Sequence, residues 1–230
     1  MQALRSAFTE VWTPSSLVPL VQFADSVRSI ANTGIDVVGL PGRPLPERLR
    51  EFDRIVSWYG ANRPEFVEAV SGLPFEFHQA LPPGDCAMHA TDFFLRQVGV
   101  SPGGVPAIKT ETGAESGTVI HPFSGSKRKN WPIENFREVA AKLENVVWLA
   151  GPEESFDGST HFDDLPDVAS LIAGATRYIG NDSGITHLAA AVGAPVIAIF
   201  GPTDPRIWAP RGENVRVLVN PTPEDVLRLC

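Results

Sequence analysis

A basic loop and a polar turn are the parts of this sequence whose residue types best suit the binding of an anion. Residues 127–129 are Lys-Arg-Lys, the only run of three bases in the chain. Residues 181–184, Asn-Asp-Ser-Gly, precede an apolar helical pattern, and the backbone N–H groups at a helix start attract phosphate. We expect Asp182 to cap this helix and Gly184 to let a ligand approach the backbone. An exposed basic loop and a capped helix without a ligand are the alternatives.

Three more side chains in the same half could contact such a ligand. His187 lies opposite the apolar positions 185, 188, 189 and 192, so we expect it to be solvated or to face a ligand or another domain. Glu153 and Glu154 follow a strand end and could accept hydrogen bonds from sugar hydroxyls, the alternative being solvated loop acids. The five histidines form no i, i+4 pair and the chain has no Cys-x-x-Cys, so we expect no metal site.

Charge and composition limit the classes of protein. The chain has 230 residues, a formal net charge of −8 and 43% hydrophobic residues. Such an acidic chain lacks the basic footprint that nucleic acid needs, so its few clustered bases indicate a small anion instead. No apolar stretch approaches the roughly 18 residues of a membrane-spanning helix. Two cysteines, Cys86 and Cys230, cannot form a disulfide framework, which favours reduced thiols in a cytosol.

Hydrophobic periodicity predicts an α/β protein with parallel strands. The first hundred residues carry weak patterns, for which we expect strands near Glu10–Trp12, Asp36–Val38, Arg54–Ser57 and Phe75–His78, and helices near Ser16–Val27, Pro64–Val70 and His89–Val98. Residues 101–117 are rich in turn formers. We therefore place a domain boundary there, between residues 1–103 and residues 104–230.

The second half carries sharper patterns. We expect strands at Thr118–His121, Val146–Ala150, Arg177–Ile179 and Val196–Phe200, and helices at Ile133–Leu143, Leu165–Ala173 and Ile185–Val192. Continuous apolar strands belong to parallel sheets that are covered on both faces. Ligands of such doubly wound sheets bind beyond the carboxyl ends of the strands, so the loop after each strand should lie along one edge. Both anion-binding segments are loops of this kind.

The segments HPFSGSKRKNWPIENF, LAGPEE and LIAGATRYIGNDSGITHLAAAVGAPVIAIFGPTDP resemble glycosyltransferase family 9, which includes the lipopolysaccharide heptosyltransferases. The resemblance implies a GT-B fold of two Rossmann-like α/β domains with parallel sheets. It implies an inverting transfer of a heptose-like sugar from a nucleoside-diphosphate donor, usually ADP-linked, to a saccharide or lipid-linked saccharide acceptor. It also implies no metal, no cofactor and a cytoplasmic protein, with at most peripheral contact at the inner face of the cell membrane.

The resemblance also assigns roles to residues. Lys129 and Ser124 correspond to the loop on the donor diphosphate, and Asp182, Ser183, Gly184 and His187 to the turn that grips diphosphate and sugar. Glu153 corresponds to the carboxylate on the ribose, with Glu154 as a substitute, and Leu165 lies near the base. The aspartate expected as the catalytic base has no match in this chain, so the catalytic residue is unassigned.

The family opens with a strand and an aspartate-bearing loop that have no counterpart here. Residues 1–8 instead have the pattern of the second half of a helix. We therefore expect the first domain to lack one βα unit and to be loosened, rearranged or completed by another chain. The chain should then bind nucleotide without glycosyl transfer. A nucleotide-sugar-binding protein without activity and a related nucleotide-sugar epimerase are the alternatives.

Overall fold

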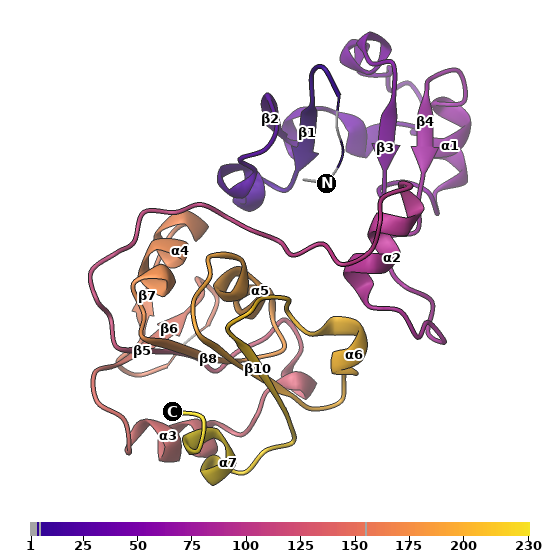
Figure 1. The fold of residues 1–230 in the computed structure, drawn as a ribbon. Coiled ribbons are helices and arrows are strands. Elements are labelled where there is room, and N and C mark those ends of the chain that lie inside the picture. The colour runs from indigo at the N-terminus through magenta and orange to yellow at the C-terminus, as the bar shows by residue number, and fades with distance from the viewer. Residues whose placement is uncertain (1–3, 5, 155) are drawn as a thin grey trace. The chain divides into compact units, whose positions relative to one another are not determined.

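The computed structural model describes residue 4 and residues 6–154 and 156–230. The chain divides into two compact units (Figure 1). Unit 1 comprises Met1–Cys86 and Ala90–Pro102, and unit 2 comprises Ala87–His89 and Gly103–Cys230.

Unit 2 is built on one parallel sheet of six strands in the order β10-β9-β8-β5-β6-β7. Its strands are β5 (Thr118–His121), β6 (Val146–Ala150), β7 (Thr160–His161), β8 (Arg177–Asn181), β9 (Val196–Phe200) and β10 (Val215–Val219). The register aligns the ends of the central strands, with His121 of β5 opposite Gly180 of β8. This is the strand order of a Rossmann domain, in which the first strand is central and the chain winds outward in both directions.

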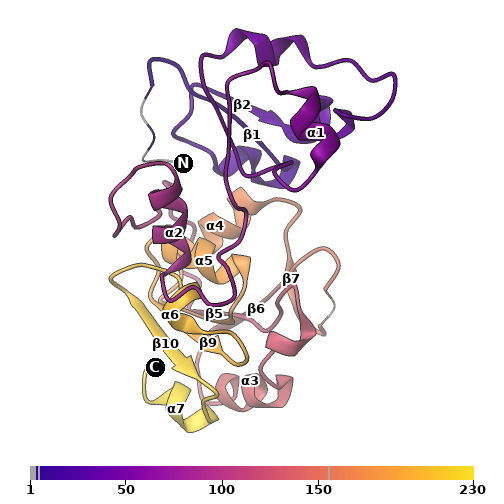
Figure 2. The ribbon, with the colours of Figure 1, turned by 90° about the vertical axis from the view of Figure 1, so that its right-hand side faces the viewer.

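Helices cover both faces of this sheet. They are α3 (Ile133–Ala140), α4 (Leu165–Ala173), α5 (Gly184–Ala191), α6 (Pro205–Trp208) and α7 (Pro223–Leu227). Figure 2 shows α3 and α7 on one face, where they contact each other, and α4 and α5 on the other. The buried runs of β5 and β9 follow from this arrangement, because neither face of a central strand meets solvent.

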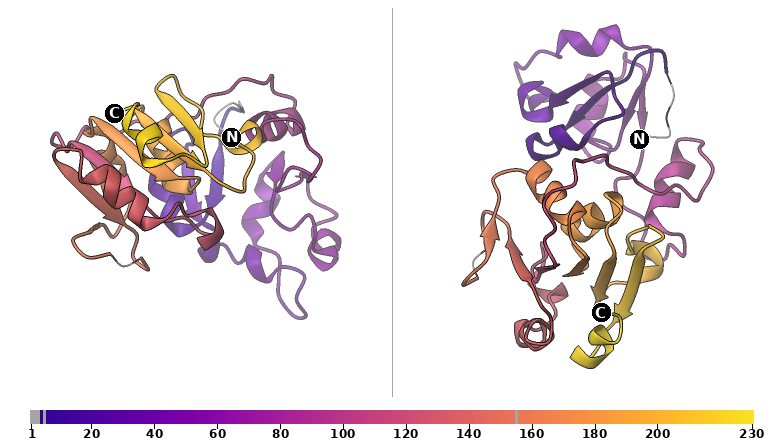
Figure 3. Two further views of the ribbon diagram at one scale, coloured as in Figure 1. Left: turned by 90° about the horizontal axis from the view of Figure 1, so that it is seen from below. Right: turned by 60° about the vertical axis from the view of Figure 1, so that its left-hand side comes forward.

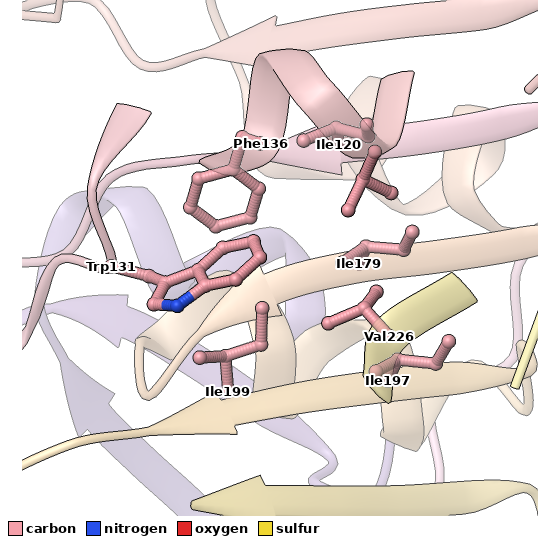
Figure 4. Close-up of a cluster of buried hydrophobic side chains, with 8 residues drawn as sticks. Ile120, Trp131, Phe136, Ile179, Ile197, Ile199 and Val226 are labelled. Carbon is pink, nitrogen blue, oxygen red and sulfur yellow. The ribbon is translucent and has the colours of Figure 1, made fainter. Parts of the chain in front are cut away.

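The core between the sheet and the α3–α7 layer is formed by large apolar side chains (Figure 4). Phe136 of α3 is fully buried and meets the ring of Trp131 edge to face, at 4.9 Å between centroids. Isoleucines from β5, β8 and β9 lie against these two rings. Burial of each such side chain contributes about 1.5–3 kcal/mol. Trp131 thereby anchors the loop that follows β5 to the sheet.

Unit 1 holds two separate two-stranded parallel sheets (Figure 3). β1 (Glu10–Thr13) pairs with β2 (Ser26–Ser29), and β3 (Ile55–Ser57) pairs with β4 (Phe75–Phe77). The α-helices are α1 (Pro64–Ala69) and α2 (Ala90–Gln97), and the 3-10 helices are η1 (Ser15–Leu20), η2 (Ile30–Asn32), η3 (Ile35–Val37) and η4 (Glu47–Glu51). The expectation of an incomplete first domain agrees with the small size of these sheets.

Two of the elements expected in unit 1 are wrong. The strand expected at Asp36–Val38 is a 3-10 turn, because Gly34 and Gly39 take positive φ angles on either side and reverse the chain there. The helix expected at Ser16–Val27 stops at Leu20 as a short 3-10 helix that contains Pro19. Its last two residues instead begin β2.

The helix expected at residues 1–8 lies partly outside the described residues, because Met1, Gln2, Ala3 and Arg5 are not described. Residues 6–8 are described and are not helical. Ser6 forms a local turn there, donating from Oγ to the backbone oxygen of Phe8 at 2.9 Å.

Candidate functional site

The order of strands in unit 2 reverses between β5 and β8. From β5 the chain winds to β6 and β7 on one side, and then crosses back to β8, β9 and β10 on the other. In doubly wound sheets, ligands bind beyond the carboxyl ends of the strands at such a reversal, here the ends of β5 and β8. The loops after these two strands are residues 122–132 and the turn 182–183, the two segments that the sequence predicted to bind an anion.

Lys129 joins the two loops. Its Nζ lies 3.2 Å from Oδ2 of Asp182, and the Oγ1 of Thr203 donates to the same oxygen at 2.7 Å. The Lys129 side chain is 27% exposed and that of Asp182 is 8% exposed. A nearly buried carboxylate therefore holds an accessible ammonium group at the sheet edge.

The sequence predicted Asp182 as the N-cap of α5, and this prediction is wrong. The cap is Ser183, whose Oγ accepts a hydrogen bond from the N–H of Thr186 at 3.3 Å. The backbone N–H of Asp182 still donates to the oxygen of Ile199 in β9, at 2.9 Å. The N-cap therefore lies one residue later than expected, and the Asp182 carboxylate binds Lys129 and Thr203 instead of the helix start.

The start of α5 is open. The N–H groups of Gly184 and Ile185 belong to the first turn and have no acceptor within the helix. A Cβ placed on Gly184 would meet no atom within 4 Å, so the glycine leaves the approach to these groups unobstructed. An anion could bind them directly, assisted by the helix dipole.

Buried polar side chains hold these loops in place through hydrogen bonds. Asn181 accepts from the N–H of Trp131 at 2.8 Å and donates to the oxygen of Pro122 at 2.7 Å, which fixes both ends of the β5 loop. Thr186, fully buried, donates to the oxygen of Asn181 at 2.5 Å. Ser124 lies 2.7 Å from the oxygen of Ser126 and 2.8 Å from Oδ1 of Asn130, so its hydroxyl fastens the loop internally.

Three supporting residues had not been recognised from the sequence: Asn181, Thr186 and Thr203. Asn181 belongs to the turn 181–184 that the sequence analysis identified, so its position in that turn could have indicated a role in the site. Thr203 lies in another loop at a strand end, Gly201-Pro-Thr-Asp-Pro, which the topology brings to the same edge.

Of the two loop acids after β6, Glu154 is the one that faces the protein. Its Oε2 accepts from the N–H of Gly151 at 2.6 Å and lies 3.0 Å from Nε2 of His121. Burial acts to raise the pKa of Glu154, but the hydrogen bonds from His121 and Gly151 outweigh it and lower the pKa below its usual value. Glu153, the acid favoured by the resemblance, is exposed.

His187 and Leu165 lie on the helices of the same face. His187 is exposed on α5, as the sequence predicted from the helix periodicity. Its pKa is lowered, chiefly by partial desolvation, while the charge of Asp182 acts in the opposite direction and that of Lys129 lowers it further. Leu165 is half-buried at the start of α4, whose N-cap is Asp164. α4 packs against α5.

Within residues 6–154 and 156–230, no three His, Cys, Asp or Glu side chains come together as metal ligands. In the same part of the chain, no helix is both long and apolar enough to cross a membrane.

Residues 163–227 match the family model described as Glycosyltransferase family 9 (heptosyltransferase). Lipopolysaccharide heptosyltransferase 1 of Salmonella typhimurium is 33% identical over 109 residues, which are 40% of this chain and 34% of that protein. Lipopolysaccharide heptosyltransferase 3 of Escherichia coli is 44% identical over 120 residues, which are 42% of this chain and 34% of that protein. The matches thus span about a third of the length of these curated relatives.

The fold extends the likeness beyond these segments. The structure of the E. coli ADP-heptose lps heptosyltransferase II superposes with a TM-score of 0.70 at 15% identity, covering 96% of this chain and 88% of that one. The two-unit α/β architecture is therefore of the GT-B type, as the resemblance implied. The match to the family model lies within unit 2, where the candidate anion-binding loops meet, so this part of the chain is similar to the heptosyltransferases of glycosyltransferase family 9.

Proposed function

We propose that this protein is an inverting glycosyltransferase that moves a heptose-like sugar from an ADP-linked donor to a saccharide or lipid-linked saccharide. One observation carries the proposal: Lys129 is held by Asp182 beside the open start of α5, at the carboxyl ends of β5 and β8, where the strand order reverses. This is the place where a doubly wound sheet binds nucleotides. The nucleotide is taken to be ADP because the structural relative is named for ADP-heptose.

In this proposal the donor diphosphate lies on the N–H groups of Gly184 and Ile185, with Lys129 neutralising its charge. Ser183 and His187 lie on the side of the sugar, a loop acid meets the ribose, and Leu165 lies near the base. Ser124 keeps the Lys129 loop in shape through its bonds to residues 126 and 130. Because these donors are already in place, they can stabilise the leaving diphosphate without a metal ion.

The reaction forms one bond and breaks another. The acceptor hydroxyl oxygen attacks the anomeric carbon of the sugar from the face opposite the diphosphate, and the bond from that carbon to the diphosphate oxygen breaks, which inverts the configuration. The hydroxyl proton passes to a general base. No residue of this chain is assigned to that role, because the expected aspartate has no match in the sequence.

A nucleotide-sugar-binding protein without transfer is the second candidate. It is favoured by the described contacts of the candidate donor site, which all lie in unit 2. An epimerase would need catalytic acids in unit 1, and the sequence identifies none. Release of ADP from an ADP-sugar in the presence of a saccharide acceptor distinguishes transfer from binding alone.

Calorimetric titration with ADP tests the donor site, first in buffer and then with EDTA. We expect saturable binding with one site and an unchanged dissociation constant in EDTA. Binding that disappears on chelation would rule out metal-free recognition. No binding under either condition would reject the nucleotide site as a whole.

A further inference from the structure

His121 and Glu154 form a hydrogen-bonded pair at the same edge of the sheet, and His121 has no role in the proposed transfer. His121 is the last residue of β5 and is only 3% exposed. Its Nε2 lies 3.0 Å from Oε2 of Glu154. A carboxylate can only accept hydrogen bonds, so Nε2 carries the hydrogen and His121 is the donor. The other ring nitrogen, Nδ1, is buried and has no partner among the described residues.

Glu154 is thereby fixed through one oxygen. Oε2 takes both described donors, the N–H of Gly151 and the imidazole of His121. Oε1 accepts no hydrogen bond from the part of the chain that the structure describes, and the side chain is 26% exposed. The carboxylate therefore presents one oriented oxygen to a ligand at the sheet edge.

The place of this oxygen suits the nucleoside part of a nucleotide. Glu154 follows β6, Asp182 follows β8, and β5 lies between these two strands. Two strand spacings separate their ends by about 10 Å. A ligand whose diphosphate binds at the start of α5 would therefore have its ribose near the end of β6.

We propose that His121 is a positioning residue, which holds Glu154 so that the free carboxylate oxygen accepts a hydrogen bond from a ribose hydroxyl. The inference rests on the proposed function, since it assumes that an ADP-linked ligand binds at this sheet edge. The lowered pKa of Glu154 agrees with it, because an ionised carboxylate is the stronger acceptor. His121 touches Glu154 and not the ligand.

The test measures binding of ADP, 2′-deoxy-ADP and 3′-deoxy-ADP to the full chain by calorimetry. Wild type should prefer ADP to at least one deoxy analogue by roughly tenfold, as expected for a hydrogen bond to a charged group. Glu154→Gln and His121→Leu should both lose this preference. His121→Leu should lower the affinity for ADP to that for the deoxy analogue, and the affinity for the deoxy analogue should not change. His121→Gln, which restores an N–H donor at similar reach, should recover the preference.

A purely structural role of His121 gives a different result, because the substitution would then weaken ADP and the deoxy analogues equally. That outcome overturns the inference, as does a preference that survives in both His121→Leu and Glu154→Gln. Glu153→Gln is the matched variant in the same loop, and loss of the preference there instead would transfer the role to Glu153. If His121→Leu does not fold, His121→Phe keeps a ring and removes the donor in its place.

The proposed function can fail separately. If wild type binds no ADP, the nucleotide site itself is rejected, and the inference with it. If wild type binds ADP but does not distinguish the deoxy analogues, the nucleotide site stands and only the inference is overturned.

Discussion

Asp182 determines where the positive charge of Lys129 lies. The carboxylate is nearly buried, and it receives hydrogen bonds from both Lys129 and Thr203. Held in this way, the ammonium group loses little side-chain freedom when a ligand arrives. A lysine that is pre-positioned can contribute more binding free energy than one that must be ordered by the ligand.

Replacing Lys129 with alanine should therefore weaken ADP binding by about 1.5–3 kcal/mol, the range for a hydrogen bond to a charged group. Lys127→Ala is the matched control, because it removes the same charge from the same 3-10 turn at an exposed position. Calorimetry of both variants gives the comparison. Equal and small losses would indicate that the loop is only a solvated basic surface.

Glu154 should make the stability of the protein depend on acid pH. Its pKa in the folded protein is lower than the usual value of 4.5. The unfolded chain therefore binds the proton more readily, and stability falls as the pH drops below about 4.5 and through the folded pKa. The difference in unfolding free energy between wild type and Glu154→Gln should narrow over that range, as measured by urea unfolding at several pH values. A difference in unfolding free energy that stays constant over that pH range would contradict the assignment.

At the scale of elements, a substitution at the start of α5 should change ADP affinity without lowering the stability of the protein. A Cβ on Gly184 meets no atom within 4 Å, and alanine is favoured over glycine in helices by up to about 1 kcal/mol. Gly184→Ala should therefore leave the melting temperature unchanged or slightly higher. The added methyl group would nevertheless lie where an anion must approach, so ADP affinity should fall. Gly72→Ala, at another open position in unit 1, is the control. Full ADP affinity in Gly184→Ala would mean that the diphosphate binds elsewhere.

The elements that the sequence predicted with the right bounds are those with long or uniform patterns. The strand Val196–Phe200 and the helix Leu165–Ala173 agree with the structure residue for residue. β7 and α7, with two and five residues, are too short to show a period. β10 is an edge strand with a mixed burial pattern, so it lacks the continuous apolar signal of its neighbours.

Some features of the candidate site could be predicted from the sequence and others could not. Its loops could be located, because parallel strands bring their carboxyl ends to one edge. The side-chain contacts within the site could not be predicted, since Thr203 lies 21 residues from Asp182 along the chain, and His121 lies 33 residues from Glu154. Such pairs depend on the order of strands in the sheet, which no local pattern contains. The roles assigned to individual donor-binding residues stay predictions.

At the scale of the whole molecule, the described contacts of the candidate donor site fall within one unit. The sheet of six strands, the Lys129–Asp182 pair, the start of α5 and the His121–Glu154 pair all lie between residues 103 and 230. The core under this site is built from the same span. Residues 87–89 also belong to unit 2, and His89 bonds the oxygen of Ala209 at 2.9 Å.

A fragment of residues 103–230 should therefore fold and bind ADP with the affinity of the full chain. It loses the contact of His89, so we expect a lower melting temperature, with a cost of about 0.5–1.5 kcal/mol for that hydrogen bond. Circular dichroism establishes whether the fragment is folded, and calorimetry with ADP then gives its affinity beside that of the full chain. Lys129→Ala in the fragment should reproduce the loss seen in the full chain, because both partners of that contact are retained. A folded fragment that binds ADP much more weakly would show that residues outside 103–230, either in unit 1 or at 87–89, contribute to the donor site.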